Sequence, residues 1–110
     1  MKISFIKSTV VVILAALLPS ATANSCIRQS NVLYTYIVKA DGVKDIPGAC
    51  GGLWDNLKRF PACVASKTTC SKKNGNLYWK FNVGKGCDGG MVESTWWEAT
   101  RNKFGAINCP

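Results

Sequence analysis

The sequence predicts an α+β fold in which two helices cover one face of a four-stranded antiparallel sheet. Its apolar periodicities give the order strand, helix, strand, strand, helix, strand (βαββαβ), which is the split βαβ pattern. Right-handed crossovers then place both helices on the same face of the sheet. The chain has 110 residues and six cysteines, which is typical of a small domain held together by three disulfides.

The first half of the chain supplies a strand, a helix and a second strand. Residues 31–39 (NVLYTYIVK) alternate and are rich in β-branched and aromatic side chains, which indicates a strand. Residues 45–60 carry apolar side chains three and four positions apart, and Asp45 is a suitable N-cap, so we expect a helix that ends before Pro61. Residues 62–69 (ACVASKTT) are expected to form a short strand.

The second half supplies the remaining three elements. Residues 71–76 contain the Asn74-Gly75 hairpin signal and lead into residues 76–83 (NLYWKFNV), which alternate strictly and indicate a strand. A glycine-rich loop at 84–90 precedes a helix over 91–103. This helix buries Trp96 and turns Trp97 away, because adjacent residues lie about 100° apart on a helix. Residues 106–109 (AINC) are expected to form the last strand.

Residues 1–23 have the features of a secretory signal peptide. Lys2 and Lys7 precede an apolar run at 10–18, and Ala21-Thr22-Ala23 matches the cleavage pattern of small residues. A membrane anchor is the alternative, but spanning needs about 20 apolar residues. We therefore expect a secreted, extracellular protein whose single domain comprises residues 24–110.

The predicted topology restricts the pairing of the six cysteines. It places Cys50 and Cys70 at one end of the sheet and the other four at the opposite end, which predicts a Cys50–Cys70 disulfide. Three pairings of the remaining four stay open. The expected strand neighbours favour Cys26–Cys109 and Cys63–Cys87. The chain has no histidine and no CxxC motif, so we expect neither a metal site nor a cofactor.

Leader, domain length, cysteine number and element order together resemble the small secreted cysteine-rich proteins of fungi. Among these, the chain is similar to effectors with the α/β-sandwich fold of the smut-fungus killer toxins. The resemblance implies a virulence effector acting on a plant host or a toxin acting on competing fungi, and it carries over no catalytic residue. Lys58-Arg59 is a dibasic pair of the kind that secretory proteases cut, or simply two solvated cations near a helix end.

The domain is basic, with twelve Lys and Arg residues against six Asp and Glu residues. A cationic patch around the hairpin and one exposed tryptophan are the candidate partner-binding residues, although the lysines could equally be a solvated hairpin tip. These candidates are Lys67, Lys72, Lys73, Tyr78, Lys80, Lys85 and Trp97. Backbone N–H groups of the 84–90 loop are a weaker candidate for anion binding.

The composition favours binding over catalysis, because the commonest general base is absent. We expect a monomeric, non-enzymatic effector or toxin that binds an unknown host or competitor protein through a basic surface. One alternative is a cationic antimicrobial protein that acts on anionic membranes. The other alternative is a small secreted ribonuclease that lacks histidine, although nucleic acid is not the expected partner.

Overall fold

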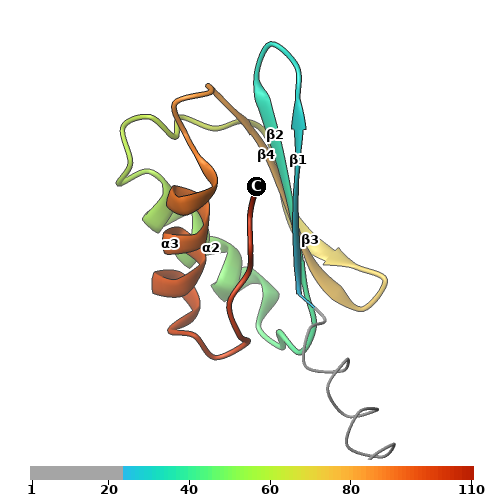
Figure 1. The fold of residues 1–110 in the computed structure, drawn as a ribbon. Helices are drawn as coiled ribbons and strands as arrows, with labels where there is room; N and C mark the ends of the chain where they lie inside the picture. The colour runs from blue at the N-terminus through green and yellow to red at the C-terminus, as the bar shows by residue number, and fades with distance from the viewer. Residues whose placement is uncertain (1–23) are drawn as a thin grey trace, which may run out of the picture.

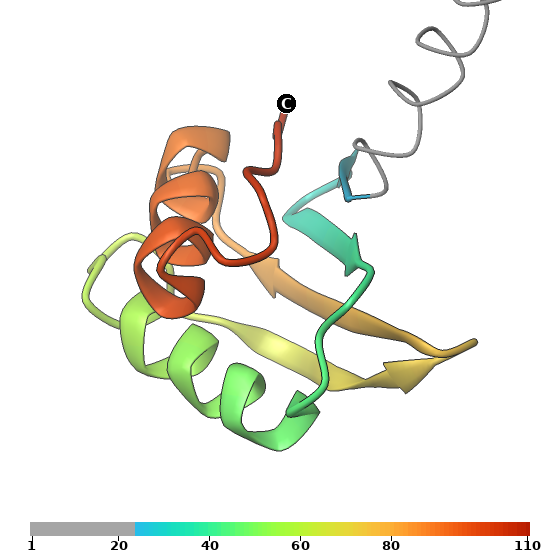
Figure 2. The same ribbon diagram turned by 90° about the horizontal axis from the view of Figure 1, so that it is seen from below.

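The computed structural model describes residues 24–110, which form one α+β domain (Figures 1 and 2). The predicted signal peptide lies outside these residues. The elements follow the chain in this order: β1 (Ser25–Ser30), β2 (Tyr34–Ala40), α2 (Ile46–Leu57), β3 (Ser66–Lys73), β4 (Asn76–Val83) and α3 (Gly89–Thr100). The sheet order is β1-β2-β4-β3, and all neighbours are antiparallel. The fold class is confirmed, with both helices on one face of the sheet.

One edge strand differs from the prediction. Residues 106–109 form no strand, and the edge beside β2 is occupied by β1, which forms a hairpin with β2. The βαββαβ order thus follows the chain from β2 onward, with the C-terminal segment 105–110 in the last position. This segment runs between α3 and β1 (Figure 1). It bonds to side chains instead of a ladder, because Glu93 Oε2 accepts the Cys109 N–H at 2.7 Å and Trp96 Nε1 donates to Gly105 O at 2.8 Å.

Local signals explain where the elements begin and end. Asp45 accepts a hydrogen bond from the Gly48 N–H at 3.1 Å, and Asp88 accepts one from the Met91 N–H at 3.0 Å, so each carboxylate caps a helix N-terminus. The β3–β4 turn is the pair Asn74-Gly75, with φ of 53° and 83°. Because both residues take positive φ, this turn matches the twist of the two strands. It is tighter than the predicted turn over 71–76, so β3 continues to Lys73. β3 also begins later than the predicted strand over 62–69, at Ser66.

The core lies between the sheet and the two helices and is rich in aromatic side chains. Trp79 and Phe81 of β4 have ring centroids 4.7 Å apart, and Trp54 of α2 packs edge-on against Trp79 at 5.7 Å. Trp96 of α3 is 1% exposed whereas its neighbour Trp97 is 50% exposed. The predicted division of this tryptophan pair is therefore confirmed.

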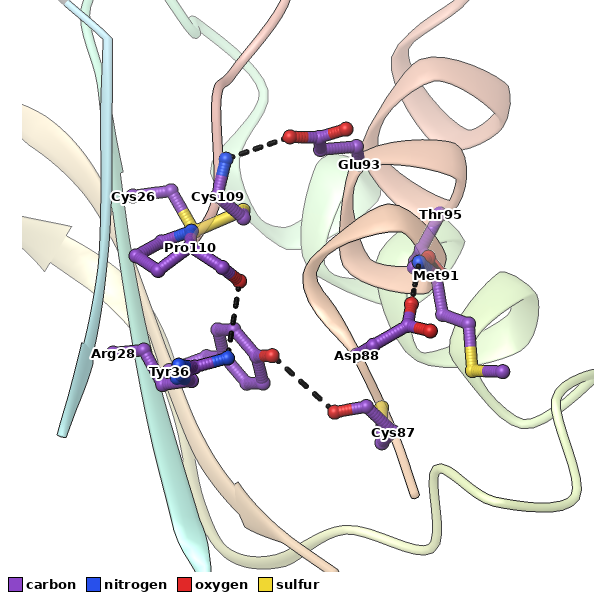
Figure 3. Close-up of a disulfide and its surroundings, with 10 residues drawn as sticks. All are labelled: Cys26, Arg28, Tyr36, Cys87, Asp88, Met91, Glu93, Thr95, Cys109 and Pro110. Carbon is purple, nitrogen blue, oxygen red and sulfur yellow. Dashed lines mark hydrogen bonds between the residues drawn. A yellow bond between two sulfur atoms is a disulfide. The ribbon is translucent and has the colours of Figure 1, made fainter. Parts of the chain in front are cut away.

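All six cysteines are paired, in the three pairs that the topology favours. Cys50–Cys70 joins α2 to β3, and Cys63–Cys87 joins the two loops that precede β3 and α3. Cys26–Cys109 joins β1 to the C-terminal segment (Figure 3). Each disulfide is expected to stabilise the domain by about 2–5 kcal/mol, and more for a longer loop.

Candidate binding surface

The sheet face opposite the helices is not covered by any other element of residues 24–110 (Figures 1 and 2). Strand alternation decides which side chains it carries. In β4, Leu77, Trp79, Phe81 and Val83 are buried toward the helices, so the residues between them face the other way. The register aligns Ser25, Lys39, Tyr78 and Ser71 in one row and Ile27, Ile37, Lys80 and Thr69 in the next. We call this surface the open sheet face.

The net charge of the domain is located on the sheet. None of the four strands contains an Asp or Glu, and together they hold six cations. These are Arg28, Lys39, Lys67, Lys72, Lys73 and Lys80. The helices and loops hold the other six cations of residues 24–110 together with all six acids. Outside the strands the charges therefore cancel, and the strands carry the whole formal charge of +6.

Tyr78 is the centre of the basic part of the open sheet face. The Lys73 ammonium lies 4.4 Å from the centre of the Tyr78 ring, and the Lys39 ammonium lies 6.0 Å from it. Both distances allow a cation–π attraction. Lys80 follows two residues later on the same strand and the same face. A partner that approaches Tyr78 therefore meets three ammonium groups, and no carboxylate on the strands themselves.

The open sheet face also has an apolar and a polar row. Ile27 on the edge strand is 49% exposed, and its cross-strand neighbour Ile37 is 8% exposed. In the adjoining row, the Thr35 hydroxyl donates to Asn82 Oδ1 at 2.6 Å. The surface is therefore a basic region around Tyr78 bordered by one exposed isoleucine, and not a uniform charge field.

The structure brings together only some of the candidate residues. Lys73, Tyr78 and Lys80 share the open sheet face, whereas Lys72 pairs with Leu77 and lines a hollow beside Ile46 on the helix side. Three other candidates lie apart from this group: Lys67 is in an irregular part of β3 with φ of 49°, Lys85 is at the far end of the sheet, and Trp97 is on α3.

Sequence reasoning missed Lys39. The alternation within residues 31–39 already places Lys39 on the same face as Thr35 and Ile37, so the signal was present. The predicted cationic cluster follows the chain from residue 67 to residue 85, whereas Lys39 joins Tyr78 from a neighbouring strand that is distant in sequence.

Most carboxylates of the domain already have structural partners. Asp45 and Asp88 cap the helices, Glu93 binds the Cys109 amide, and Asp55 pairs with Lys58 at 3.2 Å. Within residues 24–110, no group of three or more His, Cys, Asp or Glu side chains could hold a metal ion. No helix in this range is long and apolar enough to cross a membrane.

One buried phenol is perturbed. The Tyr36 hydroxyl donates a hydrogen bond to Cys87 O at 3.2 Å, beneath the Cys26–Cys109 disulfide (Figure 3). Burial raises the pKa of Tyr36 above its ordinary value, and the nearby Arg28 guanidinium opposes that shift. Tyr36 therefore stays protonated and serves the packing of the domain.

Comparisons with known protein families, with curated proteins and with solved structures find no match to this chain. Function is therefore inferred from the residues of the chain itself. The disulfides and the small domain are consistent with an extracellular protein, and the open sheet face is its most distinctive surface.

Proposed function

We propose that the protein is a secreted effector or toxin that acts by binding an acidic partner, on a host or on a competing organism, through the open sheet face. The observation that carries this proposal is the group of three lysines, Lys39, Lys73 and Lys80, around Tyr78 on a sheet whose strands contain no acid. Complementary charge steers association and selects partners. A sheet held by three disulfides presents these cations on a rigid frame, which lowers the entropic cost of binding.

Binding is a better interpretation than catalysis for the acidic residues. Catalytic carboxylates act on substrate from a cleft, with a pKa matched to the reaction. Four of the six carboxylates here are engaged by helix caps, a backbone amide or a lysine. Together with the absence of histidine, this supports a surface that recognises a partner, and not one that turns over a substrate.

A matched pair of charge variants tests the proposal. Lys39→Gln, Lys73→Gln and Lys80→Gln together remove three cations from the open sheet face. Lys44→Gln, Arg59→Gln and Lys103→Gln remove three exposed cations outside the strands. If each exposed ion pair with the partner contributes about 0.2–1 kcal/mol, the first variant binds between about threefold and about a hundredfold more weakly.

The readout is biological, because the partner is not known. The gene is deleted in the producing organism, and the wild type and both variants are returned and scored on a host and on competitors. We expect the control variant to restore activity and the sheet variant to fail. Full activity of the sheet variant would contradict the proposal, as would degradation of RNA or another substrate by the purified protein.

A further inference from the structure

The tip of the β1–β2 hairpin is an exposed apolar projection. Residues 31–33 lie beyond Tyr34, which forms the last pair between β2 and β4 with Val83. Val32 is 90% exposed and Leu33 is 40% exposed. In Figure 1 the hairpin extends past the end of the neighbouring strand β4. Val32 contributes almost no burial to the fold, and Leu33 beside it is only partly buried, so the pair forms an exposed apolar projection that a partner could cover.

Two cations and an aromatic ring lie directly behind this tip. The Arg28 guanidinium is 4.2 Å from the centre of the Tyr34 ring, and the Lys85 ammonium is 5.6 Å from it. Residues 24–40 contain no acid. Asp88 lies near this end of the domain, but its carboxylate is engaged in capping α3 through the Met91 N–H.

We propose that this tip is an anchor for an anionic lipid surface. Val32 and Leu33 would enter the boundary between headgroups and acyl chains, with Tyr34 at headgroup level, where aromatic rings with a polar end are favoured. Lys85 is placed to meet lipid phosphates, because long cationic side chains keep their charge at the interface while their stems lie along apolar surface. Arg28 adds positive charge behind it, and its guanidinium also donates to Pro110 O at 3.3 Å.

A lipid surface fits this tip better than a protein does. A stable protein interface buries about 800 Å² on each partner, with many contacts around a central core, and a three-residue projection offers far less. A lipid surface adapts to a small apolar projection and adds attraction for nearby cations. The proposal goes beyond the proposed function, since the hairpin tip and the basic region around Tyr78 are different parts of the sheet.

The test measures sedimentation of the purified domain with vesicles of phosphatidylcholine alone and of phosphatidylcholine mixed with phosphatidylserine, at low salt. We expect binding to the anionic vesicles only. Val32→Ser with Leu33→Ser should weaken it about tenfold or more, because two apolar side chains no longer leave water. Lys85→Gln should weaken it about fivefold. Val64→Ser is the matched control, since Val64 is 79% exposed on another loop and should leave binding unchanged.

A fluorescent variant reports insertion directly. Val32→Trp should shift its emission to shorter wavelength on anionic vesicles, and Val64→Trp should not. Unchanged binding of the Val32→Ser, Leu33→Ser variant, or no binding of the wild type to anionic vesicles, would overturn the proposal. If vesicle binding instead needs Lys39, Lys73 and Lys80 and not the tip, the anchor proposal fails while the basic sheet surface stands. If the variant without Lys39, Lys73 and Lys80 loses biological activity but still binds vesicles, both proposals are supported and concern separate surfaces.

Discussion

The Cys26–Cys109 disulfide should contribute more to stability than either of the other two. It joins residues 83 positions apart, compared with 20 for Cys50–Cys70 and 24 for Cys63–Cys87. In the chain-entropy description, the first crosslink stabilises the domain by about 4.6 kcal/mol and the second by about 3.3 kcal/mol. Replacing Cys26 and Cys109 by alanine should therefore remove a large part of the 5–15 kcal/mol that is typical of a domain.

The C-terminal segment makes this loss partly local. Without the disulfide it is held by the burial of Ile107, which is 6% exposed, and by hydrogen bonds at Gly105, Cys109 and Pro110. Each hydrogen bond contributes about 1 kcal/mol. Ordering each residue costs about 1–2 kcal/mol of backbone entropy. Over the six residues of the segment the entropy cost equals or exceeds the gain from three hydrogen bonds and one buried isoleucine, so we expect the segment to detach before the rest of the domain unfolds.

Denaturant unfolding of the three double-alanine variants ranks the disulfides by their contribution to the free energy of unfolding. Unfolding is followed by the fluorescence of the buried Trp79 and Trp96. Hydrogen exchange of the amide of residue 109, which donates to Glu93, measures the local detachment. A Cys26, Cys109 variant that loses less free energy of unfolding than the Cys50, Cys70 variant would refute the reasoning. An amide of residue 109 that stays protected in the first variant would refute the local part of it.

Two further predictions concern single residues. A Cβ on Gly89 would overlap the carbonyl oxygen of Pro110, so Gly89→Ala should destabilise the domain by about 1–3 kcal/mol. Gly51 is an exposed helix position with open space around it, so Gly51→Ala should stabilise the domain by about 0.5–1 kcal/mol. Equal effects of the two substitutions in thermal unfolding would contradict this reasoning. Because burial raises the pKa of Tyr36, the folded state keeps a proton that the unfolded state loses above about pH 10, so stability falls as the pH rises through that range. Tyr36→Phe should lose about 1 kcal/mol with the Cys87 hydrogen bond and flatten that decline in denaturation series at several pH values, and an unchanged slope would count against it.

Much of the fold was predictable because local signals and tertiary packing agree. Strict alternation predicted β4 with its observed bounds, and Asp45 was correctly identified as an N-cap. The pairing of the cysteines was predictable because the predicted topology places the correct partners at the same end of the sheet. β1 was missed because its sequence, SCIRQS, has a single β-branched side chain. Its pairing with β2 and its disulfide hold it in the sheet, and neither shows in local composition.

The candidate site was less predictable than the fold. Residues 67–85 are close in sequence, but they cross a hairpin with two faces and two ends, so their cations separate in space. The useful neighbours of Tyr78 come from β2 and β3. Register across strands, and not distance along the chain, decides which charges meet.

The crosslinks also determine what a single break in the backbone would do. If a protease cut the chain after Arg59, between α2 and β3, the two fragments would remain covalently joined through Cys26–Cys109 and Cys50–Cys70. A nicked molecule would thus keep its shape and its exposed cations. That tolerance would suit the proposed secreted effector, which would meet proteases outside the cell.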